Sequence, residues 1–362
     1  MHSHLDTQKE IGLLLPEDAV TRQSAARRAN SITARSFNDV QIIGRHVIKS
    51  SNACTFAGEV YFYEHLPTSL SSHFAALISS ETIEPTVSAK EATAPTRVIT
   101  LEKIEGPTFS HLVTSRCLTT ARFGRLLDAL SAIHAYRAPS SSSEPLVNVY
   151  DNYATKLHRR FTESTPIYSA AATEGMEKPT ALFQYLQTHL EAYEAEDRAL
   201  KVDVVHGDPV FSNVLLDKAG DIRLIDMRGK VGETLTYPFF FSRCKRKKDS
   251  EVSDRLRGDA IYDLAKVYQS ICGYDFILVG RQSDSDVDQR ILGDIKHCFV
   301  RFVQSNYPTI ALLDVILVTA SLYFSLIPLH DNLEHHKHFY AKACQLAAEH
   351  KEQSQRPTWT AT

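Results

Sequence analysis

The sequence has few of the features that mark disulfide-bonded, zinc-stabilised or nucleic-acid-binding proteins. Its six cysteines include no C-x-x-C pair, and no histidine follows them at zinc-finger spacing. In a chain of 362 residues, scattered cysteines are typical of reduced thiols, so we expect a cytoplasmic location. The formal net charge of -3 provides no overall attraction to nucleic acid, and no nucleic-acid partner is expected.

A secretory signal and a clear membrane span are also missing. Residues 1–20 do not show the basic segment followed by an apolar core that such a signal needs. One apolar run, from Thr309 to His330, is almost long enough to cross a bilayer. Asp314, Pro328 and several serines and threonines within it favour a buried helix. We therefore expect no membrane span, with insertion of this run as the alternative.

A Walker A motif is absent, which excludes that class of nucleotide-binding fold. What is present is the composition of an ordinary folded protein, with 43% hydrophobic and 23% charged residues. A chain of this length can form one large domain or two lobes.

The first part of the chain predicts a small lobe of antiparallel strands that carries one helix. After a polar leader (residues 1–21), short β segments end in the apolar run Val47–Lys49. In residues 56–66 apolar side chains recur at helical spacing. Residues 71–106 predict two further strands separated by a polar, proline-containing loop. We place this nucleotide-binding lobe at residues 22–104.

From about Pro107 the pattern changes to long helices. Residues 119–136 place their apolar side chains on one stripe, and further helices are expected near Asn152 and Thr180 and throughout the last third. The predicted fold class is therefore α+β, with a large, mainly helical lobe over residues 105–352 and a polar tail over 353–362.

One segment, HGDPVFSNVLLDKAGDIRLIDMRG from His206, combines polar side chains with a short hairpin. The strands NVLLD and IRLID flank a turn in which Gly220 supplies the backbone freedom. Because the entry and exit of a two-stranded hairpin lie at the same end, Asn213 and Asp226 are expected to converge. Asp208 lies in the loop just before them. A hairpin that served only the core would need none of these three side chains.

This set of residues matches the needs of phosphoryl transfer. That reaction uses magnesium held by oxygen ligands, and a carboxylate close to the attacking hydroxyl. Asn213 and Asp226 supply the ligands, and Asp208 is left to orient the acceptor hydroxyl and to accept its proton. Each residue alone is equally well explained by turn formation or solvation. The prediction therefore rests on the joint pattern.

The pattern H-G-D-x-x-x-x-N followed by I-D-M-R-G resembles the aminoglycoside phosphotransferase and choline kinase family, small-molecule kinases with a two-lobed protein-kinase-like fold. More narrowly, HGDPVFSN, IDMRG and GDAIYDLAK look like phosphotransferase-family proteins associated with bacterial surface-polysaccharide assembly. The motifs occupy residues 206–266, and from Ser31 to Ala347 the likeness is otherwise one of layout. The resemblance implies a kinase that uses Mg²⁺ and ATP or GTP.

The resemblance also implies a role for each motif residue. Asp208 corresponds to the catalytic base, Asn213 and Asp226 to the magnesium ligands, and His206 to a brace of the loop. Asp263 is implied to hydrogen-bond the catalytic loop from the start of a helix. A plain N-terminal helix cap explains Asp263 equally well.

In the small lobe the family needs a strand lysine that pairs with a helix glutamate above the nucleotide phosphates. Lys49 in HVIKSS fits this position. Its partner is Glu59 or Glu64, and Glu59 in the first helical turn is preferred. Backbone groups from Glu102 to Ile104 are expected to contact the nucleotide base.

The chain also departs from related kinases. No G-x-G-x-x-G loop precedes Lys49, so residues such as 36–38 are expected to cover the phosphates. Protein kinases carry a lysine two positions after the catalytic aspartate, where this chain has Val210. This favours a small acceptor such as a sugar, a sugar derivative or an amino alcohol. The alternatives are a divergent protein kinase and a catalytically inactive protein that binds a nucleotide or a partner.

Charged clusters outside the motif are ambiguous. The RCKRKK run (243–248), and Lys156 with Arg159 and Arg160, either attract an anionic substrate or are solvated, and solvation is preferred. Neither has the interleaved aromatic residues typical of nucleic-acid binding. Residues 283–288, SDSDVD, begin like a calcium loop but lack its glycine and final glutamate, which predicts a solvated loop.

Overall fold

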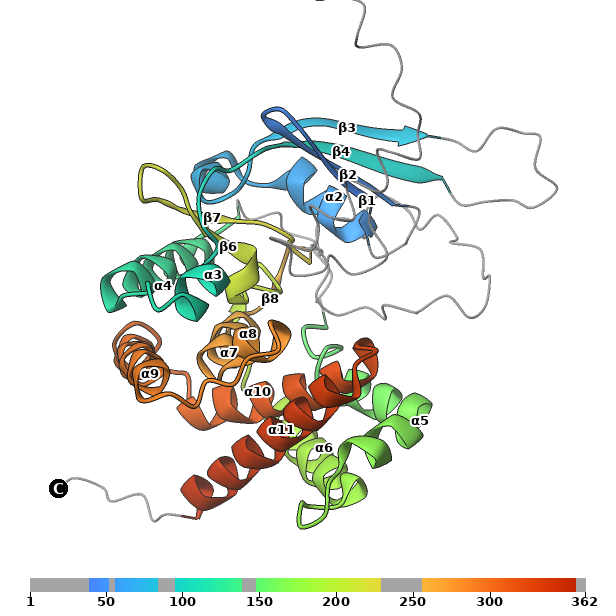
Figure 1. The fold of residues 1–362 in the computed structure, drawn as a ribbon. Coiled ribbons are helices and arrows are strands. Elements are labelled where there is room, and N and C mark those ends of the chain that lie inside the picture. The colour runs from blue at the N-terminus through green and yellow to red at the C-terminus, as the bar shows by residue number, and fades with distance from the viewer. Residues whose placement is uncertain (1–38, 52–55, 84–94, 139–147, 229–255, 356–362) are drawn as a thin grey trace, which may run out of the picture.

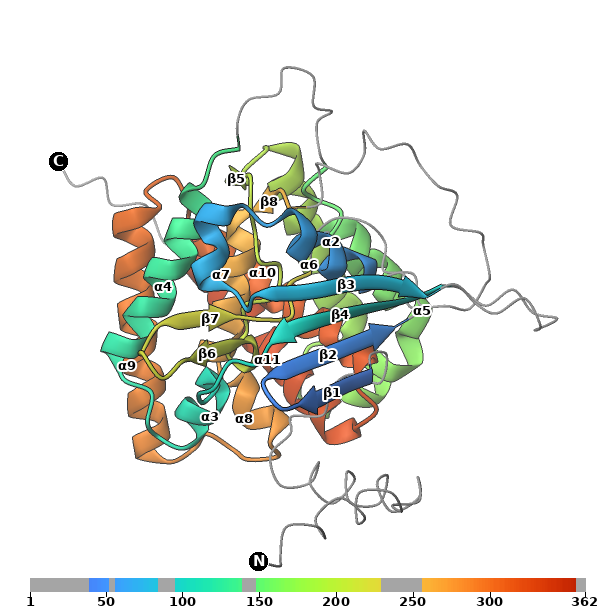
Figure 2. The ribbon, with the colours of Figure 1, turned by 90° about the horizontal axis from the view of Figure 1, so that it is seen from above.

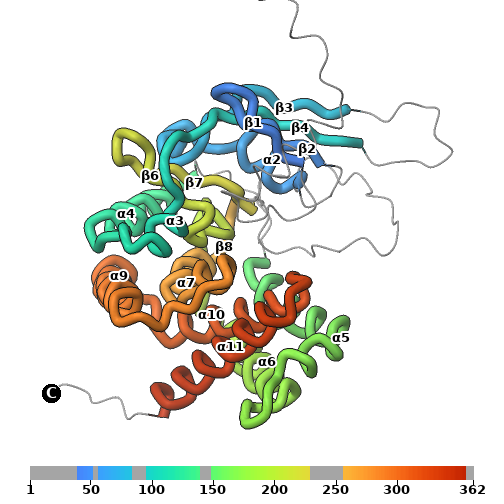
Figure 3. Tube along the Cα trace, in the orientation of Figure 1, coloured from blue at the N-terminus to red at the C-terminus, as the bar shows by residue number. Residues whose placement is uncertain are grey.

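The computed structural model describes residues 39–51, 56–83, 95–138, 148–228 and 256–355. A lobe built on an antiparallel sheet lies above a larger, mainly helical lobe (Figure 1). The chain completes the sheet lobe first and then forms the helical lobe (Figure 3). This arrangement confirms the two-lobed α+β layout predicted from the sequence.

The elements alternate little between strand and helix. Those of the sheet lobe are β1 (Asp39–Ile43), β2 (His46–Ser51), α2 (Phe56–His65), η1 (Thr68–His73), β3 (Leu77–Ile83) and β4 (Thr96–Glu102). Those that follow are α3 (Phe109–Thr114), α4 (Thr120–Ala135), α5 (Ala154–Ala171), α6 (Pro179–Ala195), β5 (Lys201–Val202), η2 (Phe211–Asn213), β6 (Val214–Leu216), β7 (Ile222–Leu224), β8 (Gly258–Asp259), α7 (Ala260–Ile271), α8 (Tyr274–Leu278), α9 (Asp286–Asn306), α10 (Leu312–Leu326), η5 (Ile327–Leu329) and α11 (Leu333–Ser354).

The sheet of the small lobe has the strand order β1-β2-β4-β3, with antiparallel neighbours throughout (Figure 2). Lys49 on β2 lies opposite Val40 on β1 and Ile99 on β4, so it occupies an inner strand. Helix α2 packs against the sheet, and its Phe62 ring lies 5.2 Å from that of Phe74. Strand β2 therefore delivers Lys49 to a buried position next to α2.

The β6–β7 hairpin lies at the junction of the lobes. Leu224 of β7 pairs with Phe74, which follows η1, and Leu215 of β6 pairs with Thr108, which precedes α3. The chain that connects the lobes runs close to this hairpin. A Cβ atom at Gly106 would lie 1.9 Å from the carbonyl oxygen of Leu216. Only glycine allows this approach, which fixes the hairpin against the interlobe connection.

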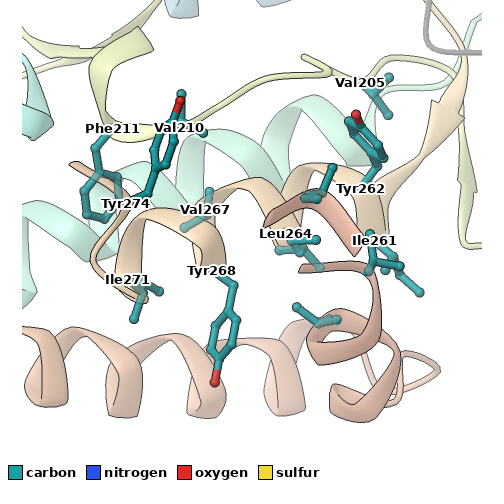
Figure 4. Packing of buried hydrophobic residues seen from close by; sticks show 14 of the residues in the cluster. Val205, Val210, Phe211, Ile261, Tyr262, Leu264, Val267, Tyr268, Ile271 and Tyr274 are labelled. Atoms are coloured by element: carbon teal, nitrogen blue, oxygen red, sulfur yellow. The ribbon is translucent and has the colours of Figure 1, made fainter. Parts of the chain in front are cut away.

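Helix α7 is the centre of the helical lobe, and all of its residues are buried. Tyr262 projects from α7 toward the segment containing Val205 and Val210, whereas Tyr268 projects to the opposite side (Figure 4). Helix α10 packs against α7 and α11. Of the window Leu312–Leu329, which is long and apolar enough to cross a membrane, 78% is buried inside the protein. The apolar run therefore forms the core helix that was expected.

The prediction of a solvated loop at residues 283–288 is wrong for Asp288. Ser285 caps α9, and Asp288 in the first turn of that helix is buried. Arg116 and Arg281 form ion pairs with it at 2.9 and 2.8 Å. The hydrogen bond from Arg116 is the main reason why the pKa of Asp288 falls to about 2. Both arginines come from other elements, so the local sequence could not show this burial.

We expect Gly106→Ala to lower the free energy of unfolding by about 1–3 kcal/mol, because the added methyl group collides with backbone. Urea denaturation measures this. Gly124→Ala on α4 is the matched control, since a Cβ there meets nothing within 4 Å. That variant should be neutral or more stable by up to about 1 kcal/mol. Equal effects of the two substitutions would contradict the close approach at Gly106.

Candidate active site

The loop that begins at His206 is held by the carboxylate of Asp263, which is fully buried on α7. One carboxylate oxygen accepts the backbone N–H of His206 at 2.8 Å, and the other accepts that of Gly207 at 2.7 Å. His134 of α4 contacts the same carboxylate at 3.1 Å. The alternative role as a helix cap falls to Asp259, whose side chain accepts the N–H of Ile261.

Within the loop, Gly207 and His206 set the direction of Asp208. Gly207 has a φ of +81°, a conformation that favours glycine. The Nδ1 atom of His206 accepts the backbone N–H of Asp208 at 3.1 Å. Burial lowers the pKa of His206, so the ring is a neutral structural group. His206 therefore lies where a brace of the loop is needed.

The Asp208 carboxylate is held by two cations that the sequence analysis did not single out. Lys266 of α7 contacts one oxygen at 3.0 Å, and Arg228 contacts the other at 2.8 Å. The proximity of Asp208 is the largest reason why the pKa of Arg228 is raised. A signal for Lys266 was present, because a residue three positions after Asp263 lies on the same helix face.

Asn213 and Asp226 lie at the same end of the hairpin, as its register requires. Val214 pairs with Leu224, and the N–H of Ile225 donates to the carbonyl of Asn213 at 3.0 Å. The Asn213 side-chain amide donates to the carbonyl of Asp208 at 2.9 Å, which leaves its own oxygen as an acceptor. Asp226 is half-exposed and has a φ of +60°.

These two oxygen donors fit a magnesium ion, which proteins hold through one or two side chains together with phosphates and water. Among the described residues no group of three or more His, Cys, Asp or Glu side chains could hold a metal alone. A bound ion would therefore take its remaining ligands from outside the protein.

Lys49 connects the sheet lobe to this site. Its ammonium lies 2.7 Å from a carboxylate oxygen of Glu59 on α2 and also forms an ion pair with Asp226. The alternative partner, Glu64, instead accepts a hydrogen bond from Ser80. Burial acts to lower the pKa of Lys49, but Asp226 and Glu59 outweigh burial and raise it, so the ammonium stays charged.

The segment expected to contact a nucleotide base is partly engaged already. The N–H of Glu102 donates to Ala76, and that of Lys103 donates to Arg45, each at 2.9 Å. The Glu102 carboxylate pairs with Arg223. This narrows the predicted contact to carbonyl oxygens and the N–H of Ile104. Residues 36–38 and 243–248, also proposed for the site, lie outside the described residues.

No protein-family model and no curated protein matches the sequence. Solved structures do match. A thermostable mutant of aminoglycoside phosphotransferase APH(4)-Ia has a TM-score of 0.52 and 13% identity, over 88% of this chain and 92% of that chain. A glucosamine kinase in complex with glucosamine, ADP and inorganic phosphate has a TM-score of 0.53 and 13% identity, over 88% and 80%. The chain has the two-lobed kinase-like fold of these structures, which confirms the fold implied by the motif.

We expect Asp263→Ala to lower the free energy of unfolding by about 3–5 kcal/mol, because it leaves buried donors of the loop without an acceptor. Urea denaturation measures the change. Asp284→Ala, which removes an exposed carboxylate, is the control and should change stability by less than about 0.5 kcal/mol. An equally small loss for Asp263→Ala would show that the loop is held by other contacts.

Proposed function

We propose that this protein is a kinase that transfers the γ-phosphate of ATP or GTP to a hydroxyl of a small molecule. One observation carries the proposal. Lys49 contacts Glu59 of the sheet lobe and Asp226 at the end of the hairpin, 177 positions away in the sequence. A buried ammonium placed between two lobes, next to paired oxygen donors, suits the phosphates of a nucleotide.

Asp208 acts on the acceptor in this proposal. Its carboxylate accepts the proton of the acceptor hydroxyl as the hydroxyl oxygen bonds to the γ-phosphorus. The bond between that phosphorus and the oxygen bridging to the β-phosphate breaks, and the nucleoside diphosphate leaves with that oxygen. Lys266 and Arg228 orient the carboxylate and place positive charge near the transferred group.

Asn213 and Asp226 would hold Mg²⁺, which neutralises phosphate charge when bound. The Asn213 amide is anchored to the Asp208 carbonyl. This contact ties the ion-binding end of the hairpin to the loop that carries the base. The backbone at Ile104 is the proposed contact for the nucleotide base.

The acceptor class rests on the chain and on its neighbours. The complete set of Lys49, Asp208, Asn213 and Asp226 favours an active enzyme over an inactive kinase-like protein. The titles of the structural neighbours name aminoglycosides and glucosamine, so a sugar, a sugar derivative or an amino alcohol is the acceptor that we propose. The link to surface-polysaccharide assembly stays a prediction.

The lobes and the compartment complete the proposal. We assign nucleotide binding to residues 22–104 and acceptor binding to residues 105–352, with the close contact at Gly106 marking the junction. A cytoplasmic location is supported by free thiols at Cys117, Cys272, Cys298 and Cys344.

The first test is release of ADP or GDP from the magnesium nucleotide in the presence of pooled hexoses, sugar phosphates, amino alcohols and aminoglycosides. We expect acceptor-dependent release that falls about 100-fold or more in Asp208→Asn, because the base is lost. Lys49→Met should fall similarly, whereas Lys337→Met, at an exposed position on α11, should match the unaltered protein. Nucleotide binding without release from any pool would favour the inactive-kinase alternative.

Removal of divalent metal provides a separate test. EDTA should abolish release and added MgCl₂ should restore it. Asn213→Ala and Asp226→Asn should each raise the Mg²⁺ concentration needed for half-maximal activity by about tenfold or more, because each removes one of two oxygen ligands. Asp217→Asn, at the far end of the hairpin, should leave the Mg²⁺ requirement unchanged. Full activity in EDTA would contradict the assignment of the ligands.

A further inference from the structure

A row of basic side chains continues from Asp208 into the helical lobe. Lys266 and Arg228 contact the Asp208 carboxylate directly. Lys156, in the first turn of α5, lies next, and its ammonium donates to the Tyr262 hydroxyl at 3.0 Å. The centroid of the Tyr262 ring is 4.9 Å from the Lys156 ammonium and 6.0 Å from the Lys266 ammonium. One phenol therefore lies between two lysines.

Lys156 is buried, with an exposed fraction of 9%, so the preferred sequence interpretation of a solvated side chain is wrong for it. Within the parts of the chain that the structure describes, no Asp or Glu forms an ion pair with Lys156. The Tyr262 hydroxyl occupies one of the three N–H donors of the ammonium. A buried ammonium without an anionic partner is costly, which is the situation that a bound anion would relieve.

The charges around Lys156 strengthen this argument. Burial is the main reason why its pKa lies well below the usual value, and Arg160, Lys266 and Arg228 lower the pKa further. Among the groups that act on Lys156, Asp208 works in the opposite direction. The surroundings therefore have a positive field, and an anion that arrived there would hold the lysine in its charged form.

The position of Lys156 separates it from the expected nucleotide phosphates. Lys49 takes its electrostatic partners from α2 and from Asp226, and Lys156 is not among them. Helix α5 packs on α6, α10 and α11, and it lies in the helical lobe away from the sheet (Figure 1). The contacts thus run from Lys49 to Asp226 on one side of the site. They run from Asp208 through Lys266 and Tyr262 to Lys156 on the other.

We propose that the acceptor carries an oxyanion, a phosphate monoester or a carboxylate, which binds Lys156 beside Tyr262 while the acceptor hydroxyl meets Asp208. This inference rests on the kinase function proposed above and adds the charge of its substrate. An acceptor with an ammonium group would meet like charge at Lys156 and be disfavoured.

A binding test needs no turnover. The thermal unfolding of the protein saturated with MgADP is followed as inorganic phosphate is added, with chloride of equal ionic strength as reference. Phosphate should raise the Tm of the unaltered protein and of Arg159→Met, a cation on the same helix outside the row. Lys156→Met should lose this rise. Without phosphate, Lys156→Met should be at least as stable as the unaltered protein, because it removes a buried charge.

The inference is overturned if phosphate raises no Tm beyond that in chloride, if Lys156→Met keeps the rise, or if Lys156→Met alone is strongly destabilised. The last result would make the ammonium a structural partner of Tyr262. A Lys156-dependent rise in a protein that transfers no phosphate to any acceptor would uphold the anion site and sink the kinase function, so the two failures are distinguishable.

A turnover test then compares hexoses in neutral, amino, 6-phosphate and uronic acid forms. One anionic form should exceed its neutral counterpart by about tenfold or more in kcat/KM, and the better of the two identifies the oxyanion. Lys156→Met should raise KM for that form by a similar factor with little change in kcat, because binding is lost and not chemistry. A preference for the neutral or amino form would overturn the inference.

Discussion

The carboxylate of Asp263 is the constraint on which the rest of the site depends. It receives two consecutive backbone N–H groups of the loop, at His206 and Gly207, in a position that water does not reach. Helix α7 carries Asp263 and also Lys266, which contacts Asp208. The same rigid helix therefore anchors the loop and supplies a partner to the side chain that the loop presents. Any shift of the loop would break both contacts together, so the position of Asp208 is determined twice.

The second constraint is electrostatic and joins the lobes. Lys49 lies among carboxylates from both lobes, so its charge is neutralised within the protein. Asp208 is likewise neutralised by Lys266 and Arg228. Each group that the proposed reaction uses thus has a partner of opposite charge. These partners keep the ionised forms in place in a partly buried site, where an unpaired charge would be expensive.

Much of the fold and part of the site could be predicted from local pattern. The hairpin follows from two short apolar strands around Gly220, and its geometry alone brings Asn213 and Asp226 to one end. The pairing of Lys49 with Glu59 required only a strand followed by a helix. The partners of Asp208 were missed because Lys266 comes from a helix more than fifty positions later, and no local periodicity links the two. Lys156 was misjudged because a basic segment of an amphipathic helix looks the same whether its stripe faces water or a buried tyrosine.

The left-handed backbone at Asp226 has a consequence for the history of this sequence. An aspartate in that conformation costs about 1 kcal/mol relative to glycine, so the residue lowers the stability of the fold that contains it. Selection for heat resistance alone would favour glycine at this position and would discard the carboxylate. The persistence of aspartate there means that evolution has weighed something other than stability. An engineered library screened only for survival at high temperature would be expected to lose function first at this residue.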